Sequence, residues 1–226
     1  MAISAHQQPL AITAASPRRT GMAIIGSGFG GLGMAIRLLQ NNYTDFLILE
    51  KADEVGGTWR ENQYPGAACD VQSHMYSFSF APKTDWSQRY ADCHEIHQYI
   101  LDTTEKFGLR KYCLFNHEVI GAYYQEDSAQ WRLEIKDQPD ILAQFMVLAS
   151  GPLHVPQIPT LKGIEKFQGK VFHSAQWDHQ YSLKNKKVAS IGTGGSAIQY
   201  VPEIAKEVEQ LYVFQRSAAW VIPRDE

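Results

Sequence analysis

Two short segments, far apart in this chain of 226 residues, share one arrangement of residue types. MAIIGSGFGGLG begins at Met22 and VASIGTGGSAIQ begins at Val188, and each runs from apolar residues through a glycine-rich turn into a helix-like segment. Such a turn between a strand and a helix is typical of the first βαβ unit of a dinucleotide-binding fold. One copy is weak evidence, because glycine turns also end strands for packing reasons alone. Two copies predict an α/β chain with two Rossmann-like dinucleotide-binding folds.

The three small residues of each turn have separate purposes. The first allows the tight turn, the second lets the backbone approach a pyrophosphate, and the third lets the helix pack closely on the strand. The N-terminus of the helix then faces the charge of the phosphates. These positions are Gly26, Gly28 and Gly31 in the first copy, and Gly192, Gly194 and Ala197 in the second.

The residue at the end of the second strand differs between the copies. Glu50 lies 24 residues after Gly26, and Arg216 lies 24 residues after Gly192. An acid at this position accepts hydrogen bonds from the two ribose hydroxyls of adenosine, whereas an arginine suits a 2′-phosphate. Either charge alone fits a solvated strand end, but that interpretation leaves the matched spacing unexplained. We therefore expect the first turn to bind FAD or NAD, and the second to bind NADPH.

Composition and charge exclude several other classes of protein. The formal net charge of −3 gives no sign of a nucleic-acid or membrane-surface partner, and no apolar run approaches the ~18 residues that span a bilayer. The three cysteines, Cys69, Cys93 and Cys113, form no CxxC pair, and their odd number without a signal peptide favours a reducing, cytoplasmic location. His94 and His97 form an HxxH pattern without further ligands at suitable spacing, so no metal site is predicted.

Apolar periodicity and turn signals divide the chain into three segments. Residues 1–21 have no periodicity and are expected to be a disordered tail. Residues 22–155 form the first nucleotide-binding domain, and residues 156–226 begin the second after the proline-rich connector PLHVPQIP. We expect this second domain to be incomplete, because a start with two parallel strands cannot cover its own faces. The apolar residues expected to lack partners are Leu211, Val213, Trp220 and Val221.

The same signals predict individual elements. Alternating apolar residues over 119–124 and 131–136 predict a hairpin that projects from the first sheet. The other predicted strands are 22–25, 46–50, 145–149, 187–191 and 211–214, and the predicted helices are 32–40 and 93–107.

The two ligands together indicate a flavoprotein that NADPH reduces. A hydride moves from the nicotinamide to the flavin, so the two folds must face each other. In disulfide reductases a cysteine pair follows the acid of the first fold, but here that place reads GGTW, with Cys69 at a distance. This disfavours dithiol chemistry and leaves molecular oxygen as the expected electron acceptor.

At this point the sequence resembles a known family. GSGFGGLG, GGTWRENQYPGAACD and FQGKVFHSAQWD resemble motifs of the class B flavoprotein monooxygenases, and the resemblance extends from Met22 to Arg224. The relatives that oxygenate amines and sulfides usually carry Tyr or Phe where Trp177 stands, so the chain is most similar to the Baeyer–Villiger group. An N- or S-oxygenating flavin-containing monooxygenase is the alternative. The third motif is the specific one, and its fixed positions are Phe167, Gly169, His173, Trp177 and Asp178.

The resemblance implies roles for particular residues. Glu50 would bind the adenosine ribose of FAD, Asp70 would lie beside the flavin ring, and Val119 would contact the adenine through its backbone. His173 would sit at the hinge between the folds, with Trp177 at their interface, and Asp70 and His173 are the candidates for a catalytic role. The residues that would pass along or near the flavin are Gly57, Thr58, Trp59 and Tyr76. The residues that would wrap the NADPH pyrophosphate are Thr193, Gly194, Gly195 and Ser196, with Arg216 at the 2′-phosphate.

The resemblance also implies a reaction. NADPH reduces the flavin, O2 adds to give a peroxyflavin that bound NADP shields from water, and the peroxide attacks a ketone so that an ester or lactone forms. The small-molecule substrate is thus a ketone or another oxidisable compound. The family's catalytic arginine is expected beyond residue 226. A non-catalytic product that at most binds nucleotide is the alternative from a different class.

Overall fold

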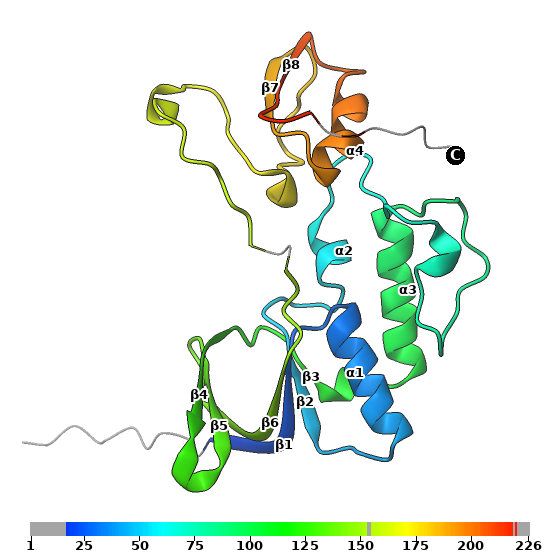
Figure 1. The fold of residues 1–226 in the computed structure, drawn as a ribbon, viewed down its shortest axis with the longest axis vertical. Coiled ribbons are helices and arrows are strands. Elements are labelled where there is room, and N and C mark those ends of the chain that lie inside the picture. The colour runs from blue at the N-terminus through cyan, green and yellow to red at the C-terminus, as the bar shows by residue number, and fades with distance from the viewer. Residues whose placement is uncertain (1–16, 153–154, 219, 221–226) are drawn as a thin grey trace, which may run out of the picture.

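The computed structural model describes residues 17–152, 155–218 and 220, which form two groups of elements (Figure 1). None of the helices in these ranges combines the length and the apolar character needed to cross a membrane. The first unit contains β1 (Arg18–Ile25), α1 (Phe29–Gln40), β2 (Phe46–Leu49), α2 (Thr58–Glu61), α3 (Cys93–Lys106), β3 (Cys113–Leu114), β4 (Val119–Gln125), β5 (Gln130–Ile135) and β6 (Ile141–Leu148). The second unit contains β7 (Lys187–Ile191), α4 (Gly195–Ile204) and β8 (Gln210–Phe214). The predicted α/β class is confirmed.

The first unit is built on a six-stranded sheet of order β3-β2-β1-β6-β5-β4. The strands β3, β2, β1 and β6 are parallel, and β5 and β4 are antiparallel. One face packs against α1 and α3 through a cluster that includes Ile24, Ile36 and Ile96 (Figure 1). On the other face, Leu133 of β5 shares a second cluster with Ala23 of β1, so the antiparallel end of the sheet covers that face. β2, together with Ala23 and Ile24 of β1, is therefore buried on both faces, as parallel sheets require, whereas Phe145 and Leu148 of β6 are 52% and 70% exposed.

The first strand and the first helix begin earlier than the sequence predicts. β1 starts at Arg18, inside the segment expected to be a tail, because Arg18 pairs with Ile141 of β6. Pairing with β6 satisfies the backbone N–H and C=O groups of this segment, although the side chains are exposed. The pattern of apolar side chains therefore does not show that the strand begins here. Helix α1 starts at Phe29, directly after its N-cap Gly28, so the predicted glycine turn already contains the first helical residues.

The hairpin of β4 and β5 is present but does not project from the sheet, which corrects the prediction. β5 pairs with β6 through Trp131 opposite Ala143 and Leu133 opposite Ile141. The hairpin therefore extends the sheet by two antiparallel strands. The alternating pattern within the hairpin predicts which residues face the core, but it carries no information on the strand that β5 joins.

The second unit has a separate two-stranded parallel sheet, in which α4 connects β7 to β8. The predicted bounds of β7 are confirmed, and β8 starts one residue earlier than predicted. The side chains of Ile191, Val213 and Phe214 are 54%, 44% and 56% exposed, and Trp220 is fully exposed. This is the uncovered apolar surface expected for a sheet of two strands, while Val221 lies outside the described residues.

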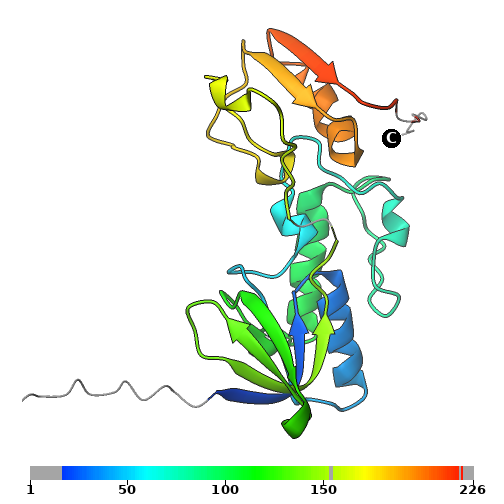
Figure 2. The ribbon, with the colours of Figure 1, turned by 60° about the vertical axis from the view of Figure 1, so that its left-hand side comes forward.

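The two units meet at a small apolar group of side chains, called the bridging cluster below. The centroid of the Tyr200 ring lies 6.0 Å from that of Tyr64 and 5.5 Å from that of Trp177. Trp177 is therefore at the contact between the units, where the sequence places it. Figures 1 and 2 both show α4 near the N-terminal end of α3, where this cluster lies. The cluster consists of Tyr64, Ala67 and Cys93, with Trp59, Trp177 and Tyr200 packed against them.

Candidate functional site

A cavity of about 560 Å³ opens at the carboxyl ends of β1, β2 and β6, where the first glycine turn leads into α1. Open α/β sheets bind ligands at this edge. Of the residues that the sequence assigns to FAD, those that line the cavity are Gly26, Gly28, Glu50, Gly57, Thr58, Trp59, Tyr76 and Val119. The structure thus brings together residues that are up to 93 positions apart in the sequence.

The first turn requires glycine for two different reasons. Gly26 has a φ of +103°, which side chains rarely tolerate, and its N–H donates to the carbonyl oxygen of Leu49 over 2.8 Å. A Cβ atom on Gly31 would lie 1.9 Å from the carbonyl oxygen of Gly26, so the close approach of α1 excludes any side chain there. Gly28, the N-cap, places the first N–H groups of α1 at the cavity wall.

The GGTW segment forms a second wall because two further glycines bring it against the turn. Gly56 and Gly57 have φ values of +135° and +53°. The Gly56 N–H donates to the carbonyl oxygen of Ser27 over 3.1 Å, and a Cβ atom on Gly57 would lie 3.1 Å from the Cα of Gly28. The two backbones touch, and Thr58 and the following residues of α2 continue along the cavity.

Glu50 follows β2 directly and is 5% exposed. Its carboxylate accepts hydrogen bonds from the Ser27 N–H at 3.0 Å, the Ser27 hydroxyl at 2.6 Å and the Ala52 N–H at 3.0 Å. Burial acts to raise the pKa of Glu50, but these bonds and the charge of Arg60 outweigh it and hold the pKa below its usual value. The carboxylate is therefore ionised at neutral pH, at the place where the sequence predicts a ribose.

Arg60 is a member of the site to which the sequence analysis assigned no role. Its Nη2 atom lies 3.4 Å from Oε1 of Glu50 and 3.0 Å from Oε1 of Glu61, and its Nη1 donates to the carbonyl oxygen of Glu54. The guanidinium is mostly buried, and it lines the cavity. Arg60 therefore balances the negative charge of Glu50 and fixes its orientation.

An aromatic pair closes another side of the cavity. The indole N–H of Trp59 donates to the hydroxyl oxygen of Tyr76 over 3.1 Å, and the two rings meet edge to face at 5.3 Å. Burial raises the pKa of Tyr76, so its hydroxyl is neutral at pH 7. Such a pair offers a rigid wall for a flat aromatic ligand.

The second glycine turn repeats the backbone geometry of the first. Gly192 has a φ of +106°, and its N–H donates to the carbonyl oxygen of Phe214 over 2.8 Å. Gly194 caps α4 with φ −78° and ψ −174°, compared with −81° and −169° for Gly28 at α1. No atom lies within 4 Å of a Cβ built on Gly192 or Gly194, so this turn is open.

The residues assigned to NADPH surround this open turn. Thr193, Gly195 and Ser196 lie in the turn or in the first turn of α4, and Ala197 is buried beneath it. Arg216 is exposed beyond the end of β8. The segment from Thr193 to Ser196 thus presents backbone N–H groups at the N-terminus of α4.

The equal spacing of Glu50 and Arg216 hides a difference of one residue. Ile25 of β1 pairs with Leu49 of β2, 24 residues later, whereas Ile191 of β7 pairs with Phe214 of β8, 23 residues later. In register, Gln215 matches Glu50, and Arg216 is one position further along. The shorter connection through α4 causes the difference, and it carries Arg216 past the strand end.

The structure places Asp70 at the junction of the two units and not among the residues that line the first cavity. Its Oδ1 accepts a hydrogen bond from the side-chain amide of Gln199 over 2.8 Å. A Cβ atom on Gly195 would lie 3.8 Å from its Oδ2. Asp70 therefore lies beside the N-terminal turn of α4.

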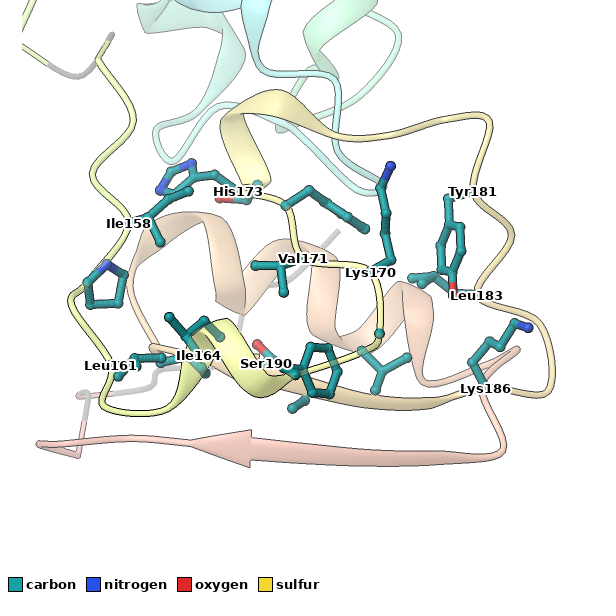
Figure 3. A pocket seen from close by; sticks show the side chains of 18 of the residues that line it. Ile158, Leu161, Ile164, Lys170, Val171, His173, Tyr181, Leu183, Lys186 and Ser190 are labelled. Atoms are coloured by element: carbon teal, nitrogen blue, oxygen red, sulfur yellow. The ribbon is translucent and has the colours of Figure 1, made fainter.

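His173 lines a different cavity, of about 570 Å³, between the segment 158–183 and the elements β7 and α4. Figure 3 shows Ile158, Leu161 and Ile164 at one end of this cavity and Tyr181 and Leu183 at the other. The His173 ring accepts a hydrogen bond through Nδ1 from the N–H of Ala175 over 3.1 Å and so caps the short helix η5 (Ser174–Gln176). His173 is thus separate from the first cavity.

The cysteines and His97 have structural partners. The three cysteines are buried thiols that form no disulfide in the described part of the chain, and burial raises the pKa of the Cys113 thiol to about 12, so it is protonated at neutral pH. The thiol of Cys69 donates to the carbonyl oxygen of Val71. The ring of His97 bonds through Nε2 to the carbonyl oxygen of Val55 over 2.9 Å, and so holds the loop before the GGTW segment.

Sequence reasoning missed Ser27, Arg60 and Gln199. Ser27 stands at a variable position of the glycine pattern, and Arg60 lies inside the GGTWRENQYPGAACD motif, for which only Gly57, Thr58, Trp59 and Asp70 were assigned roles. For Gln199 one signal was present, since it is a polar residue within the mainly apolar segment of α4, but its partners lie far away in the sequence.

Comparison with known proteins identifies similar chains. The family model described as flavin-binding monooxygenase-like matches residues 19–226. A "Baeyer-Villiger monooxygenase" of Streptomyces coelicolor is 49% identical over 203 residues, which cover 90% of this chain and 39% of that protein. A protein of the same name from Pseudomonas aeruginosa is 48% identical over 223 residues, which cover 97% of this chain and 42% of that protein. The chain thus spans about two fifths of the length of these relatives.

Solved structures show the same relationship. A steroid monooxygenase bound to NADP superposes with a TM-score of 0.82 at 38% identity, covering 91% of this chain and 40% of that chain. The enzyme OTEMO in complex with FAD and NADP superposes with a TM-score of 0.83 at 32% identity, again covering 91% of this chain and 40% of that chain.

Proposed function

Because the chain belongs to the flavin-binding monooxygenase-like family, we propose that it forms the FAD-binding domain and the start of the NADPH-binding domain of a Baeyer–Villiger monooxygenase. The FAD-binding domain comprises residues 18–155, and the NADPH-binding domain begins at residue 156. Both are Rossmann-like. The reaction inserts one oxygen atom of O2 beside the carbonyl group of a ketone.

The observation that carries this proposal is the pair of matched turns, each followed, at or just past the end of its second strand, by a residue of opposite charge. Gly28 and Gly194 agree within a few degrees in both backbone angles. The first turn is followed by the ionised carboxylate of Glu50, and the second by the exposed guanidinium of Arg216. Equal turns with opposite charges fit two different dinucleotides, one with a free adenosine ribose and one with a 2′-phosphate.

The residues of the first cavity fit FAD. The N–H groups at the start of α1 receive the pyrophosphate, and the absence of a Cβ on Gly28 leaves room for it. Glu50 accepts the ribose hydroxyls, and the Trp59–Tyr76 pair packs beside the flavin ring. The volume of about 560 Å³ lies in the range typical of small-molecule sites.

The second turn fits NADPH in the same way. The N–H groups at the start of α4 receive the pyrophosphate, together with Thr193 and Ser196, and Arg216 binds the 2′-phosphate. When bound, FAD accepts a hydride from NADPH and reacts with O2. Asp70 lies at the junction of the two units, beside the N-terminal turn of α4, and is proposed to lie near the flavin ring.

The ketone is proposed as the substrate because the two relatives described above are named Baeyer–Villiger monooxygenases. Oxidation of nitrogen or sulfur remains the alternative. His173 is proposed to hold the connector between the domains through its cap on η5. The three buried thiols, which form no disulfide among the described residues, support a reducing compartment, and we propose the cytoplasm.

Turnover tests the proposed function. A polypeptide limited to residues 1–226 is expected to bind FAD weakly and to form no ester, because the apolar faces of β7 and β8 are uncovered. This chain joined to the remaining C-terminal part of the Streptomyces coelicolor relative is expected to oxidise ketones with NADPH. The measurement is NADPH consumption with added FAD, together with detection of the ester or lactone by gas chromatography.

Two results would contradict these expectations. Ester formation by the 226-residue polypeptide at about 1 per second or more, a rate typical of enzymes, would show that the second unit is sufficient as it stands. A joined protein that binds FAD but is not reduced by NADPH would remove the proposed function itself.

Replacing Arg216 by alanine is expected to change the choice of coenzyme. Loss of one charge-assisted contact to the 2′-phosphate costs about 1.5–3 kcal/mol, which corresponds to a KM for NADPH about 10- to 150-fold higher. NADH lacks this phosphate, so its KM is expected to stay the same. Lys184→Ala, which removes another exposed cation of the same unit, is the control. An unchanged ratio of the two KM values in Arg216→Ala would refute the assignment.

A further inference from the structure

The side-chain amide of Gln199 makes four hydrogen bonds between the two units. Its oxygen accepts from the Tyr64 hydroxyl and from the Ala68 N–H, both over 3.1 Å. Its nitrogen donates to the carbonyl oxygen of Ala68 over 3.1 Å and to Oδ1 of Asp70 over 2.8 Å. Gln199 belongs to α4, whereas all its partners lie in the first unit, 129 to 135 residues away.

Only a primary amide supplies this set of bonds, and asparagine, the other residue that carries one, is shorter by a methylene group. A primary amide has two N–H groups and a carbonyl oxygen with two lone pairs, and all four are used here. The side chain is 9% exposed, so water does not readily replace a lost partner. A leucine at this position would remove the acceptor of the Ala68 N–H and the amide donor to the carboxylate of Asp70.

The segment that Gln199 holds is fixed on its other side to the start of α3. The Cys69 N–H donates to the carbonyl oxygen of Ala91 over 3.0 Å, and the Cys93 N–H donates to that of Ala67 over 2.9 Å. Residues 67–70 therefore lie between α3 of the first unit and α4 of the second. A shift of α4 must move Asp70, because the amide joins them directly.

Gln199 also lies close to the second nucleotide turn. It is one helical turn after Gly195, with which α4 begins. A Cβ on Gly195 would lie 3.8 Å from Asp70, so the start of α4 and the carboxylate are neighbours without the amide contact. In the proposed function this start of α4 receives the pyrophosphate of NADPH.

We propose that Gln199 is a positioning residue that couples the two nucleotide sites by holding Asp70 and residues 67–70 against α4. This inference rests on the proposed function, because it requires one nucleotide at each turn. Ala67 shares the bridging cluster with Trp59, which lines the first cavity, so residues 67–70 are in contact with both units. A nucleotide that fixes the position of either unit also fixes this segment, and the second nucleotide then binds a chain that is already ordered. The affinities of FAD and NADP⁺ therefore depend on each other, and by the same factor in both directions.

Amide hydrogen exchange in the joined protein without nucleotide tests the structural part. In Gln199→Leu the Ala68 N–H is expected to exchange at least 10-fold faster, since it loses its acceptor, while amides in β1 and β6 keep their rates. Gln210→Leu makes the same chemical change at an exposed position of β8 and is the control. If β1 and β6 also exchange faster in Gln199→Leu, Gln199→Glu serves as the second variant, since it keeps the shape of the side chain and removes both donors.

Calorimetric titration of the joined protein, in which this chain is followed by the C-terminal part of the Streptomyces coelicolor relative, tests the coupling. NADP⁺ is titrated with and without saturating FAD, and the wild-type Kd is expected to fall at least 5-fold when FAD is present. This factor is the ratio of the Kd for NADP⁺ without FAD to the Kd with FAD. In Gln199→Leu the ratio is expected to fall below 2, and the Kd for NADP⁺ without FAD is expected to stay the same. Gln210→Leu is expected to keep the wild-type factor.

The outcomes separate the inference from the proposed function. If both nucleotides bind and Gln199→Leu keeps the wild-type factor, or if the wild type shows no coupling, the role of Gln199 is wrong while the proposed function stands. If FAD and NADP⁺ fail to bind the joined protein with the wild-type residues at millimolar concentration, the proposed function is wrong, and the coupling is wrong with it.

Discussion

Gly31→Ala is expected to unfold the first nucleotide turn and to abolish retention of FAD. The added Cβ would lie 1.9 Å from the carbonyl oxygen of Gly26, where ordinary contacts lie between 3.4 and 4 Å. The neighbour is backbone, and the Gly26 N–H is itself bonded to Leu49, so no side chain can rotate away. Overpacking of a core costs about 1–3 kcal/mol when side chains can adjust, and we expect at least the upper end here.

The second turn supplies a matched control for this prediction. Ala197 is the residue that corresponds to Gly31, so the same fold already accepts a methyl group in the other copy. Ala197→Gly is expected to cost about 1 kcal/mol or less, the usual penalty of glycine within a helix. In the joined protein, urea denaturation measures the free energy of unfolding, and flavin absorbance after gel filtration measures retention of FAD. A Gly31→Ala protein that retains flavin and unfolds within 1 kcal/mol of the wild type would contradict the close-contact argument.

Glu50→Ala is expected to weaken FAD binding by a factor of 100 or more. Hydrogen bonds to charged groups are worth about 1.5–3 kcal/mol each, and the proposed site uses the carboxylate for two ribose hydroxyls. The substitution also leaves the Ser27 N–H and hydroxyl without their acceptor and removes one anionic partner of Arg60. The expected loss of about 3 kcal/mol or more corresponds to the stated factor.

Glu118→Gln separates the position of Glu50 from the general effect of negative charge. Glu118 also lines the first cavity, but its carboxylate is half exposed and paired with Lys136 over 3.2 Å. We expect this variant to bind FAD within a factor of about 3 of the wild type. The Kd for FAD is measured by flavin fluorescence quenching. Equal losses in Glu50→Ala and Glu118→Gln would show that the cavity responds to charge and not to a ribose contact at Glu50.

The depressed pKa of Glu50 also predicts a dependence of stability on pH. Since the pKa is lower in the folded chain than its usual value of 4.5, the ionised carboxylate stabilises the fold above about pH 4.5. This contribution is lost as the pH falls through the folded-state pKa. The measurement is the free energy of unfolding between pH 3 and 7. In Glu50→Gln this free energy is expected to fall less steeply at acid pH than in the wild type, because the glutamine does not ionise.

The sequence by itself determined the features that depend on local backbone. Gly26 and Gly192 were predicted as turn residues, and both adopt a φ near +105°. The bounds of β7 were predicted correctly, as was the inward face of the hairpin strand that contains Leu133. These features follow from residues within a few positions of one another, because a positive φ, a helix start or a period of two is encoded locally.

Register between strands was decided only by the tertiary structure. Equal spacing suggested that Glu50 and Arg216 are equivalent, yet the paired strands show that Gln215 matches Glu50. The strand that the hairpin joins was likewise outside the reach of the local pattern. Spacing along a chain counts residues, whereas register depends on how a connecting helix packs, and a connection one residue shorter moves every later position.

The contacts of Arg60 and Gln199 were also decided by the tertiary structure. Arg60 reaches Glu50 across 10 residues, and Gln199 reaches Asp70 across 129. Motifs specify which residues meet a ligand, since the ligand's chemistry is the same in every relative. A buried guanidinium or amide finds its partners through the packing of whole elements, and that packing is a sum of many weak contacts that no short segment of sequence contains.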